Sequence, residues 1–478
     1  MTAARRIVIV GHGMAGVRLA TDLRRHDPNL ERVAVTVVGD EPHAAYNRVL
    51  LSTVLAGTLE LASVRLAPTG PAVDTRLGVS VTAIDRQARK VELTDGSHVP
   101  YDALVLATGA RPRLPELDGA DDGKAPGITT FRTRDDCERI VADARPGLPV
   151  AVLGGGLLGL EIARGLAGRG CLVTVVHATN HLLDRQVDAM AGRVLRRALE
   201  AMGIEFRLGA TAVGYQPGDG VKLADGGHVP GELVVVATGV LPRTELARAA
   251  GLAVDRGVLV DDALRTSDPR VHAIGDCAQH KASDGGLVQP AFDQAAVLAA
   301  RLTGADPGAR YRGTPVVTRL KARGIDLAAL GDVRADPADE QPPGVEVICV
   351  QDTSRGRYAK LVLRDDRVVG AIMLGLPDAA ATIIQLFDSG APVPADRLAL
   401  LLGRALPAAT DTGSVGGLAD GALVCRCNSV SKSRLVEAWH SGAHDTAALT
   451  EATRASTGCG SCKHLVSDLA DWLATSSA

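Results

Sequence analysis

The sequence predicts an α/β protein with two Rossmann-like domains, a small α+β domain and a small helical C-terminal domain. Two glycine-rich motifs, each between an apolar strand and a helical pattern, predict the Rossmann-like domains. Alternating apolar strands after residue 306 predict the α+β domain, and four closely spaced cysteines mark the last one. The chain has 478 residues, of which 46% are hydrophobic, enough for several separate cores.

Charge and composition exclude several classes of partner. Lys and Arg number 52 against 55 Asp and Glu, with no long block of either sign, so we expect neither nucleic-acid nor membrane-surface binding. The aromatic fraction of 2% also argues against a base-stacking surface. The strand Ile7–Val10 begins too early for a signal peptide, and no apolar run approaches the roughly 18 residues of a membrane span. We therefore expect a cytoplasmic protein.

The first glycine motif directly follows the strand Ile7–Val10 and precedes a helical pattern. Its residues are Gly11, His12, Gly13, Met14, Ala15 and Gly16. In this context the first glycine allows a tight turn, the second allows a pyrophosphate to approach the backbone, and the third allows close packing of helix and strand. The helix N-terminus then offers free N–H groups to an anion.

A carboxylate after the second strand is expected to bind a ribose. The strand Val33–Val38 is followed by Gly39, Asp40 and Glu41. Because Gly39 occupies what is often the acidic position, the sequence does not choose between Asp40 and Glu41.

The second motif repeats this arrangement after the strand Leu148–Leu153. It opens the helix Glu161–Leu166 and comprises Gly154, Gly155, Gly156, Leu157, Leu158 and Gly159. The partner strand Leu172–Val176 ends at His177. An acid there would bind a ribose and exclude a 2′-phosphate, whereas a nearby arginine would bind that phosphate. His177 does neither clearly, so NADH is favoured over NADPH without being established.

The paired motifs resemble the two-dinucleotide-binding flavoprotein disulfide reductase superfamily, which is glutathione-reductase-like in fold. Three further segments occur in family order: Ala107, Thr108 and Gly109; Ala237, Thr238 and Gly239; and Gly275 with Asp276. The resemblance implies FAD in the first fold and NAD(P)H in the second, with Asp276 at the ribityl and phosphate region. From the residues alone, Asp276 could equally cap a helix.

The absence of a cysteine shortly after the first fold indicates the branch of the superfamily. Disulfide reductases carry a redox cysteine after the first fold, but the stretch Pro42–Ser52 has none, so a dithiol relay is not expected. The stretch is similar to ferredoxin reductases and nitrite reductase large subunits, which implies that Arg48 contacts the flavin or its phosphates. Thr53 stands where ferredoxin reductases usually have a lysine, which favours the nitrite reductase type. Glu161 is expected either beside the nicotinamide–flavin stack, as the catalytic residue, or as an acid favoured by the helix dipole.

The sequence after residue 288 predicts a helix and then a separate domain at about 306–405. The helix begins near Gln289, and the family packs it against the flavin. Strands are expected at Val345–Val350, Tyr358–Leu363 and Val368–Leu374, with a helix from Asp378 to Phe387. The run Thr318–Asp326 looks like the matching domain of nitrite reductase large subunits. We find no catalytic constellation there and expect packing or dimer contact.

The cysteines fall into two groups. Cys137, Cys171, Cys277 and Cys349 are scattered and are expected to be buried small hydrophobic residues. The other group consists of Cys425, Cys427, Cys459 and Cys462. Four thiolates suit a [2Fe–2S] cluster or tetrahedral zinc, and the tight C-x-C spacing favours the cluster.

The cysteine spacing resembles the bacterioferritin-associated-ferredoxin-like [2Fe–2S] domain, which also occurs in nitrite reductase large subunits. A helix after Cys462 would direct N–H groups towards thiolates and cluster sulfurs. Basic residues nearby could balance the cluster charge, although a solvated surface is the simpler expectation for each of them: Arg426, Lys432, Arg434 and Lys463.

These features predict a domain order. We expect an FAD-binding domain at 1–115 and 238–305, an NAD(P)H-binding domain at 116–237, and an α+β domain at 306–405. A linker at 406–420 would let the [2Fe–2S] domain at 421–478 reach the flavin face or swing towards a partner.

Function follows from the combination of groups. Nicotinamide gives two electrons as hydride, whereas an iron–sulfur centre accepts one at a time, and a flavin converts between the two. The resemblance implies an oxidoreductase like the free-standing electron-transfer subunits of nitrate assimilation, which feed a molybdenum-containing nitrate reductase subunit. No cysteine follows Cys462, so we expect no siroheme centre and no nitrite reduction by the chain itself.

Two alternatives stay open. The first is a ferredoxin or rubredoxin reductase, or an electron donor to nitrite reductase. The second is a redox or iron sensor, or a cluster-delivery module, with little turnover. The sequence leaves the terminal acceptor, the redox potentials and the oligomeric state undetermined.

Overall fold

The structure is a computed structural model that describes residues 4–29, 31–123, 125–281, 286–403, 417–458 and 460–476. Cys459 and most of the expected linker lie outside the described residues. Within those residues, no helix is long and apolar enough to cross a membrane.

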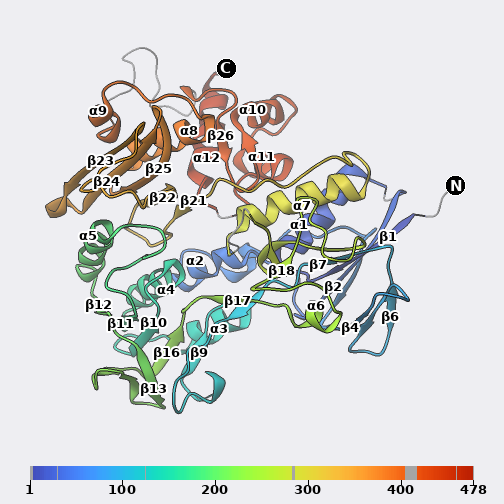
Figure 1. The fold of residues 1–478 in the computed structure, drawn as a ribbon, viewed down its shortest axis with the longest axis horizontal. Coiled ribbons are helices and arrows are strands. Elements are labelled where there is room, and N and C mark those ends of the chain that lie inside the picture. The colour runs from blue at the N-terminus through green and yellow to red at the C-terminus, as the bar shows by residue number, and fades with distance from the viewer. Residues whose placement is uncertain are drawn as a thin grey trace.

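The first Rossmann-like domain has a five-stranded parallel sheet in the order β19-β7-β1-β2-β3. Its strands are β1 (Arg5–Val10), β2 (Val33–Gly39), β3 (Asp74–Leu77), β7 (Ala103–Leu106) and β19 (Val271–Ala273). Helices α1 (Met14–His26) and α7 (Val288–Leu302) pack side by side on this sheet (Figure 1). The predicted strand and glycine-led helix are therefore present, with α1 starting at Met14.

The second Rossmann-like domain repeats this design with the order β12-β11-β10-β16-β9. Its strands are β9 (Ile128–Thr130), β10 (Pro149–Leu153), β11 (Leu172–His177), β12 (Ile204–Leu208) and β16 (Leu233–Val236). Its helices are α3 (Arg134–Asp143), α4 (Leu157–Gly168) and α5 (Ala189–Glu200). Helix α4 begins four residues before the predicted Glu161 because Gly156 already has N-cap geometry.

Smaller antiparallel elements complete both domains. One three-stranded sheet is β4 (Val81–Asp85), β5 (Lys90–Leu93) and β6 (His98–Pro100), and the other is β13 (Ala212–Gln216), β14 (Gly220–Leu223) and β15 (His228–Pro230). The pair β8 (Ala110–Pro112) and β17 (Val240–Pro242) lies where the chain crosses between the domains, because it directly follows the two Ala-Thr-Gly segments. Short elements are α2 (Leu51–Leu55), α6 (Glu245–Ala249), β18 (Val258–Leu259) and β20 (Ala278–Gln279).

The third domain is an antiparallel sheet in the order β21-β22-β25-β24-β23, and both its own helix and α5 of the second domain pack against it. The predicted strands are β23 (Val345–Asp352), β24 (Arg357–Arg364) and β25 (Arg367–Leu374), and the predicted helix is α8 (Pro377–Ser389). Three elements were not predicted from the sequence: β21 (Val317–Arg319), β22 (Leu327–Gly331) and α9 (Arg397–Leu401). A buried core of aliphatic residues joins α8 and the sheet.

The C-terminal domain packs against both the first and the third domain (Figure 1). It contains a hairpin of β26 (Leu423–Cys425) and β27 (Val430–Ser431) and three helices, α10 (Lys432–His440), α11 (Thr446–Thr453) and α12 (Lys463–Ser476). Its apolar core includes Cys425, Cys427 and Cys462, and Val288 of α7 packs against that core. The cysteine-bearing domain is thus seated on the helix layer of the first Rossmann-like domain.

Candidate functional site

The first glycine motif forms a turn that only glycine fits. Gly11 has φ +121°, and a Cβ there would overlap the carbonyl oxygen of Ala107 at the end of β7. A Cβ on Gly16 would overlap the carbonyl oxygen of Gly11. Steric necessity therefore explains the first and last glycines, which let β1, β7 and α1 meet closely.

Gly13 differs from these two glycines because it borders an open cleft. It is the N-cap of α1 with no side-chain cap, and among the described residues a Cβ there would meet only the Arg48 guanidinium, at 3.7 Å. The first N–H groups of α1 therefore point into the cleft without a side-chain acceptor at the cap, which suits an anion.

The cleft in front of Gly13 measures about 1090 Å³, including space open to solvent. Its lining contains every first-fold residue that the sequence singled out except Gly16: Gly11, Gly13, Met14, Ala15, Asp40, Glu41, Arg48, Ala107, Thr108, Gly109, Gly275 and Asp276. The size, the glycine cradle and the uncapped helix N-terminus fit a large dinucleotide such as FAD.

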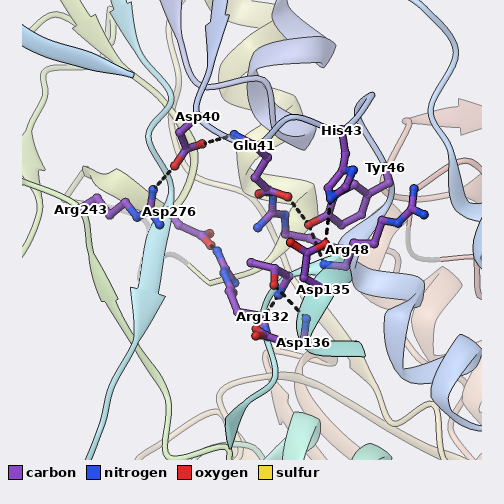
Figure 2. A network of polar contacts seen from close by, with 12 residues as sticks. Asp40, Glu41, His43, Tyr46, Arg48, Arg132, Asp135, Asp136, Arg243 and Asp276 are labelled. Carbon is purple, nitrogen blue, oxygen red and sulfur yellow. Dashed lines mark hydrogen bonds and ion pairs between the residues drawn. The ribbon is translucent and has the colours of Figure 1, made fainter. Parts of the chain in front are cut away.

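Three arginines line this cleft, and each is paired with a carboxylate (Figure 2). Arg48 lies 2.9 Å from Glu41, Arg132 lies 2.7 Å from Asp276, and Arg243 lies 2.8 Å from Asp40. Of these cations, Arg48 was predicted from the sequence, whereas Arg132 and Arg243 were missed. Neither of the missed arginines lies in a recognised motif.

The Glu41 carboxylate is already engaged by two partners. Tyr46 donates a hydrogen bond to it at 2.6 Å, and Arg48 donates a second at 2.9 Å. Burial, opposed in part by Arg48, raises the pKa of the Tyr46 hydroxyl, so Tyr46 remains a donor. Asp40 instead is half exposed and contacts Arg243. Of the two acids the sequence left open, Asp40 has the more exposed carboxylate, although it also accepts the Glu41 backbone N–H at 3.1 Å.

Asp276 sits where β19 meets the start of α1. Gly275 has φ +73°, and a Cβ there would lie 3.0 Å from that of Ala15. Gly275 donates its backbone N–H to the buried Gln294 amide oxygen of α7 at 2.7 Å. These contacts fix the Asp276 carboxylate at the cleft, where it pairs with Arg132.

The second glycine motif has the same geometry. A Cβ on Gly154 would overlap the carbonyl oxygen of Ala237, and one on Gly159 would overlap that of Gly154. A Cβ on Gly156, the N-cap of α4, would have no atom of the described residues within 4 Å beyond its chain neighbours. Leu157 and Leu158 form the first turn of α4. The open position again fits a nucleotide phosphate.

The Ala-Thr-Gly segments lie together between the two folds. Thr108 donates its hydroxyl to the Arg243 carbonyl oxygen at 3.1 Å, and Thr238 donates its hydroxyl to that of Arg113 at 2.6 Å. Gly109 and Gly239 both have positive φ, of +70° and +108°. Hydrogen bonds from each threonine to the chain that follows the other segment therefore hold the two segments together beside the β8–β17 pair.

His177 packs over the second glycine loop and brings an unexpected acid with it. A Cβ on Gly155 would lie 2.8 Å from two atoms of the His177 ring. The ring Nε2 lies 3.5 Å from the Asp184 carboxylate and 2.8 Å from the Thr179 hydroxyl. Burial lowers the pKa of His177, although Asp184 opposes this shift. Sequence reasoning missed Asp184 because it follows His177 by seven residues rather than ending the strand.

Glu161 is buried at the junction of three segments. Ser52 donates its hydroxyl to the Glu161 carboxylate at 2.5 Å. Lys321 of the third domain donates its backbone N–H at 3.1 Å, and its ammonium lies 3.2 Å from the same carboxylate. The third domain, expected to serve in packing or dimer contact, thus contributes a cation to α4, the glycine-led helix of the second fold.

Cys425, Cys427 and Cys462 are all buried, whereas Cys459 lies outside the described residues. The sulfurs of Cys425 and Cys427 are 3.7 Å apart. Hydrogen bonding from Cys427 and then from Cys462 lowers the pKa of the Cys425 thiol to about 3. A Cβ on Gly458 would overlap the Cys427 sulfur, so the loop before Cys459 must pass directly over it. Gathered thiols with one low pKa suit a metal-thiolate centre.

Asn47 ties the cysteine loop to the segment that lines the first cleft. Its buried side-chain amide donates to the Thr457 carbonyl oxygen at 2.8 Å and to the Gly458 carbonyl oxygen. The neighbouring Arg48 lines the cleft, and Leu50 lies 3.1 Å from a Cβ position on Gly460. The cleft wall and the cysteine loop are therefore in direct contact.

The basic residues near the cysteines divide into two pairs. Arg434 and Lys463 are exposed, as the solvated-surface expectation has it. That expectation is wrong for Lys432, which is buried, donates to the Leu418 carbonyl oxygen at 2.8 Å and lies over the Trp472 ring. It is also wrong for Arg426, which pairs with Asp388 of α8 and fastens the domain to its neighbour.

The scattered cysteines behave largely as expected. Cys137, Cys171 and Cys277 are buried, and burial raises the pKa of each thiol. Cys349 is the exception, because it is only partly buried and its sulfur lies 3.6 Å from the Tyr358 hydroxyl.

Comparison with protein-family models finds three matches along the chain. Residues 5–295 match the pyridine nucleotide-disulphide oxidoreductase family, and residues 316–391 match the rubredoxin NAD⁺ reductase C-terminal domain. Residues 423–472 match the BFD-like [2Fe–2S] binding domain.

Two curated relatives come from Bacillus subtilis strain 168. A nitrite reductase [NAD(P)H] is 34% identical over 97% of this chain, and an assimilatory nitrate reductase electron transfer subunit is 32% identical over 99% of it. This chain spans only 57% and 60% of those two proteins. Among solved structures, the covalent putidaredoxin reductase–putidaredoxin complex is similar, with a TM-score of 0.74, 28% identity, and coverage of 85% of this chain and 97% of that one.

Proposed function

The chain belongs to the pyridine nucleotide-disulphide oxidoreductase family, and we propose that it is an electron-transfer flavoprotein that oxidises NAD(P)H and supplies single electrons to a partner reductase. Members of the family bind FAD and NAD(P)H, and the BFD-like domain holds a [2Fe–2S] cluster. These groups supply the conversion of a two-electron hydride into single electrons.

The contact between the first cleft and the cysteine loop is the observation that carries this proposal. Asn47 bonds to the backbone of Thr457 and Gly458, while the adjacent Arg48 lines the cleft. The cleft wall and the loop that leads to Cys459 are therefore adjacent, which would give an electron a short route out of the cleft. None of the described residues that line the cleft is a cysteine, so none of them could relay electrons through a thiol.

The residues of the first cleft divide the work of binding FAD. Gly13 and the N-terminus of α1 would receive the pyrophosphate, with Arg48, Arg132 and Arg243 balancing its charge. Asp276 would accept from ribityl hydroxyls, and Asp40 is the better placed acid for the adenosine ribose.

The second fold would receive NAD(P)H at Gly156 and the start of α4. Glu161, Ser52 and Lys321 lie together between the two folds and would orient the reacting faces while limiting their exposure to water. Cys425, Cys427, Cys459 and Cys462 are the proposed cluster ligands.

A molybdenum-containing nitrate reductase subunit is the proposed acceptor. Support comes from the similarity to the assimilatory nitrate reductase electron transfer subunit over nearly the whole chain. A second candidate acceptor is a ferredoxin or rubredoxin, favoured by the match of residues 316–391 to the rubredoxin NAD⁺ reductase C-terminal domain.

The test adds NADH anaerobically to the holoprotein and follows flavin absorbance and the electron paramagnetic resonance signal of the reduced cluster. We expect both to respond, and expect Cys425→Ser to keep flavin bleaching while losing the cluster signal. Cys171→Ser is the matched control, because Cys171 is also buried but belongs to the second domain. Absence of any cluster signal from iron-loaded wild-type protein would overturn the proposal.

The acceptor is tested by adding purified nitrate reductase catalytic subunit, a ferredoxin or a rubredoxin to this system. NADH-dependent nitrate reduction with the first, at rates well above those with the two small carriers, supports the assignment. Faster reduction of either carrier favours the second candidate instead.

A further inference from the structure

Helix α1 contacts the cysteine-bearing domain through the side chain of Arg18. Its guanidinium donates to the side-chain oxygen of Asn428 at 2.5 Å and lies over the Phe292 ring, 4.9 Å from its centre. Arg18 is one turn from the N-terminus of α1, which faces the first cleft. The contact therefore joins the cofactor-binding helix to a residue 410 positions away.

Asn428 directs the other end of its amide at the cysteine sulfurs. Its nitrogen lies 3.7 Å from the sulfur of Cys425 and 3.8 Å from that of Cys427. The same nitrogen lies 2.7 Å from the Arg454 carbonyl oxygen and 3.2 Å from the Thr457 hydroxyl. Two amide hydrogens are thus shared among four acceptors, two of which are sulfurs, and the residue is buried.

We propose that Arg18 is a positioning residue that, by holding the Asn428 amide towards the sulfurs of Cys425 and Cys427, raises the reduction potential of the cysteine-bound cluster. This role rests on the proposed function, since it needs a cluster at these cysteines. Helix α1 of the first domain, and not the cysteine-bearing domain alone, would then affect the reduction potential of the cluster.

The effect is electrostatic. A reduced cluster carries one more negative charge than an oxidised one, so N–H groups directed at its sulfurs stabilise the reduced state. Arg18 fixes which end of the Asn428 amide faces the sulfurs, because a guanidinium can bond only to the oxygen end. It also polarises the amide, since its positive charge lies against the amide oxygen.

Arg18 also forms an ion pair with Asp22, which it shares with two other arginines. Asp22 of α1 is buried and accepts from Arg18 at 2.7 Å and from Arg454 at 2.7 Å, with Arg25 at 3.4 Å. Three guanidinium groups therefore surround the Asp22 carboxylate, so this ion pair does not use up the positive charge of all three.

The experiment is a redox titration of the holoprotein followed by the cluster electron paramagnetic resonance signal. The variants are Asn428→Asp, which keeps the shape, removes the N–H groups and adds a negative charge, Arg18→Gln, and Arg18→Lys as the conservative change. Arg25→Gln is the matched control, because Arg25 also pairs with Asp22 but does not bond to Asn428 as Arg18 does. Flavin and iron content are measured for every variant.

We expect Asn428→Asp and Arg18→Gln to shift the cluster reduction equilibrium about tenfold towards the oxidised state, about 59 mV for one electron. Arg18→Lys should retain part of the wild-type potential, and Arg25→Gln all of it. Fully loaded variants with unchanged potentials overturn the inference while leaving the proposed function intact. A wild-type protein without a cluster signal overturns the proposed function itself. If Asn428→Asp fails to load, Arg18→Gln alone decides.

Discussion

The ammonium of Lys321 lies 3.2 Å from the carboxylate of Glu161, and the two residues come from different domains. Glu161 is nearly fully buried in α4, whereas Lys321 precedes β22 in the third domain. Removing the cation leaves the buried carboxylate bonded to the Ser52 hydroxyl and to one backbone N–H. We therefore expect Lys321→Met to lower the free energy of unfolding by roughly 1–3 kcal/mol.

The measurement is urea unfolding of the flavin-loaded protein. Glu161→Gln removes the charge that needs Lys321, so the double variant should recover most of the loss caused by Lys321→Met alone. Strictly additive losses in the two single variants and the double variant would show that the pair does not interact.

Asn47 makes the contact on which the proposed electron route depends. Asn47→Ala removes both hydrogen bonds to the cysteine loop, at a cost of about 1–2 kcal/mol, and loosens that loop. We expect stopped-flow absorbance to show unchanged flavin bleaching by NADH and several-fold slower cluster reduction. Asn29→Ala, at an exposed position of the same domain, is the control. Equal slowing of both steps would argue against a role confined to the loop.

Much of the fold was predictable because its signals are local. The strands β1, β10, β23, β24 and β25 begin and end within two residues of the predicted ranges, since each is a continuous apolar or alternating run between turn residues. The glycine cradles were predictable for a steric reason, because Gly11 and Gly154 each lie against a carbonyl oxygen that leaves no room for a Cβ.

The contacts that complete the sites were not predictable from local patterns. Arg132, Arg243 and Asp184 stand in ordinary-looking loops, and only the tertiary fold brings them to Asp276, Asp40 and His177. Lys432 and Arg426 resembled solvated cations, but domain packing buries one and pairs the other with Asp388. Long-range ion pairs of this kind depend on docking between domains, which composition and periodicity do not encode.

Gly13 and Gly156 allow the two nucleotide sites to be tested separately. A Cβ at either position meets no backbone of the described residues beyond its chain neighbours, so alanine there should cost only the weaker N-cap, roughly 1 kcal/mol of stability. We expect Gly13→Ala to lower flavin content and Gly156→Ala to raise the KM for NADH with flavin retained. Each variant serves as the control for the other. Loss of flavin from Gly156→Ala, measured as the ratio of flavin to protein absorbance, would contradict the assignment.

His272 predicts a pH dependence of stability. It is buried in β19, and burial lowers its pKa to about 4. The unfolded chain binds this proton near pH 6.5 and the folded chain only near pH 4. The contribution of neutral His272 to the free energy of unfolding is therefore complete above pH 6.5 and is lost as the pH falls to 4. The difference corresponds to roughly 3 kcal/mol.

The measurement is the urea midpoint at several pH values between about 4 and 8, which span both pKa values. His272→Leu should flatten this part of the profile, whereas His440→Leu, at an exposed position, should leave it unchanged. An identical slope in the His272 variant would show that other groups cause the acid sensitivity.

Asp184 is expected to set the nucleotide preference. Its carboxylate lies 3.5 Å from His177 at the end of β11, the place where a Rossmann-like fold meets the adenosine ribose. A negative charge there repels a 2′-phosphate, so we expect NADH to be preferred, and Asp184→Ser to lower the ratio of kcat/KM for NADH over NADPH about tenfold, which is about 1.4 kcal/mol. Asp219→Ser is the matched control, because Asp219 makes a similar pair with His228 at 3.2 Å, on the β13–β15 sheet of the same domain. Both variants remove one carboxylate from a histidine pair. A lower NADH preference in Asp184→Ser but not in Asp219→Ser would identify the ribose site, and an unchanged ratio in Asp184→Ser would show that other residues discriminate between NADH and NADPH.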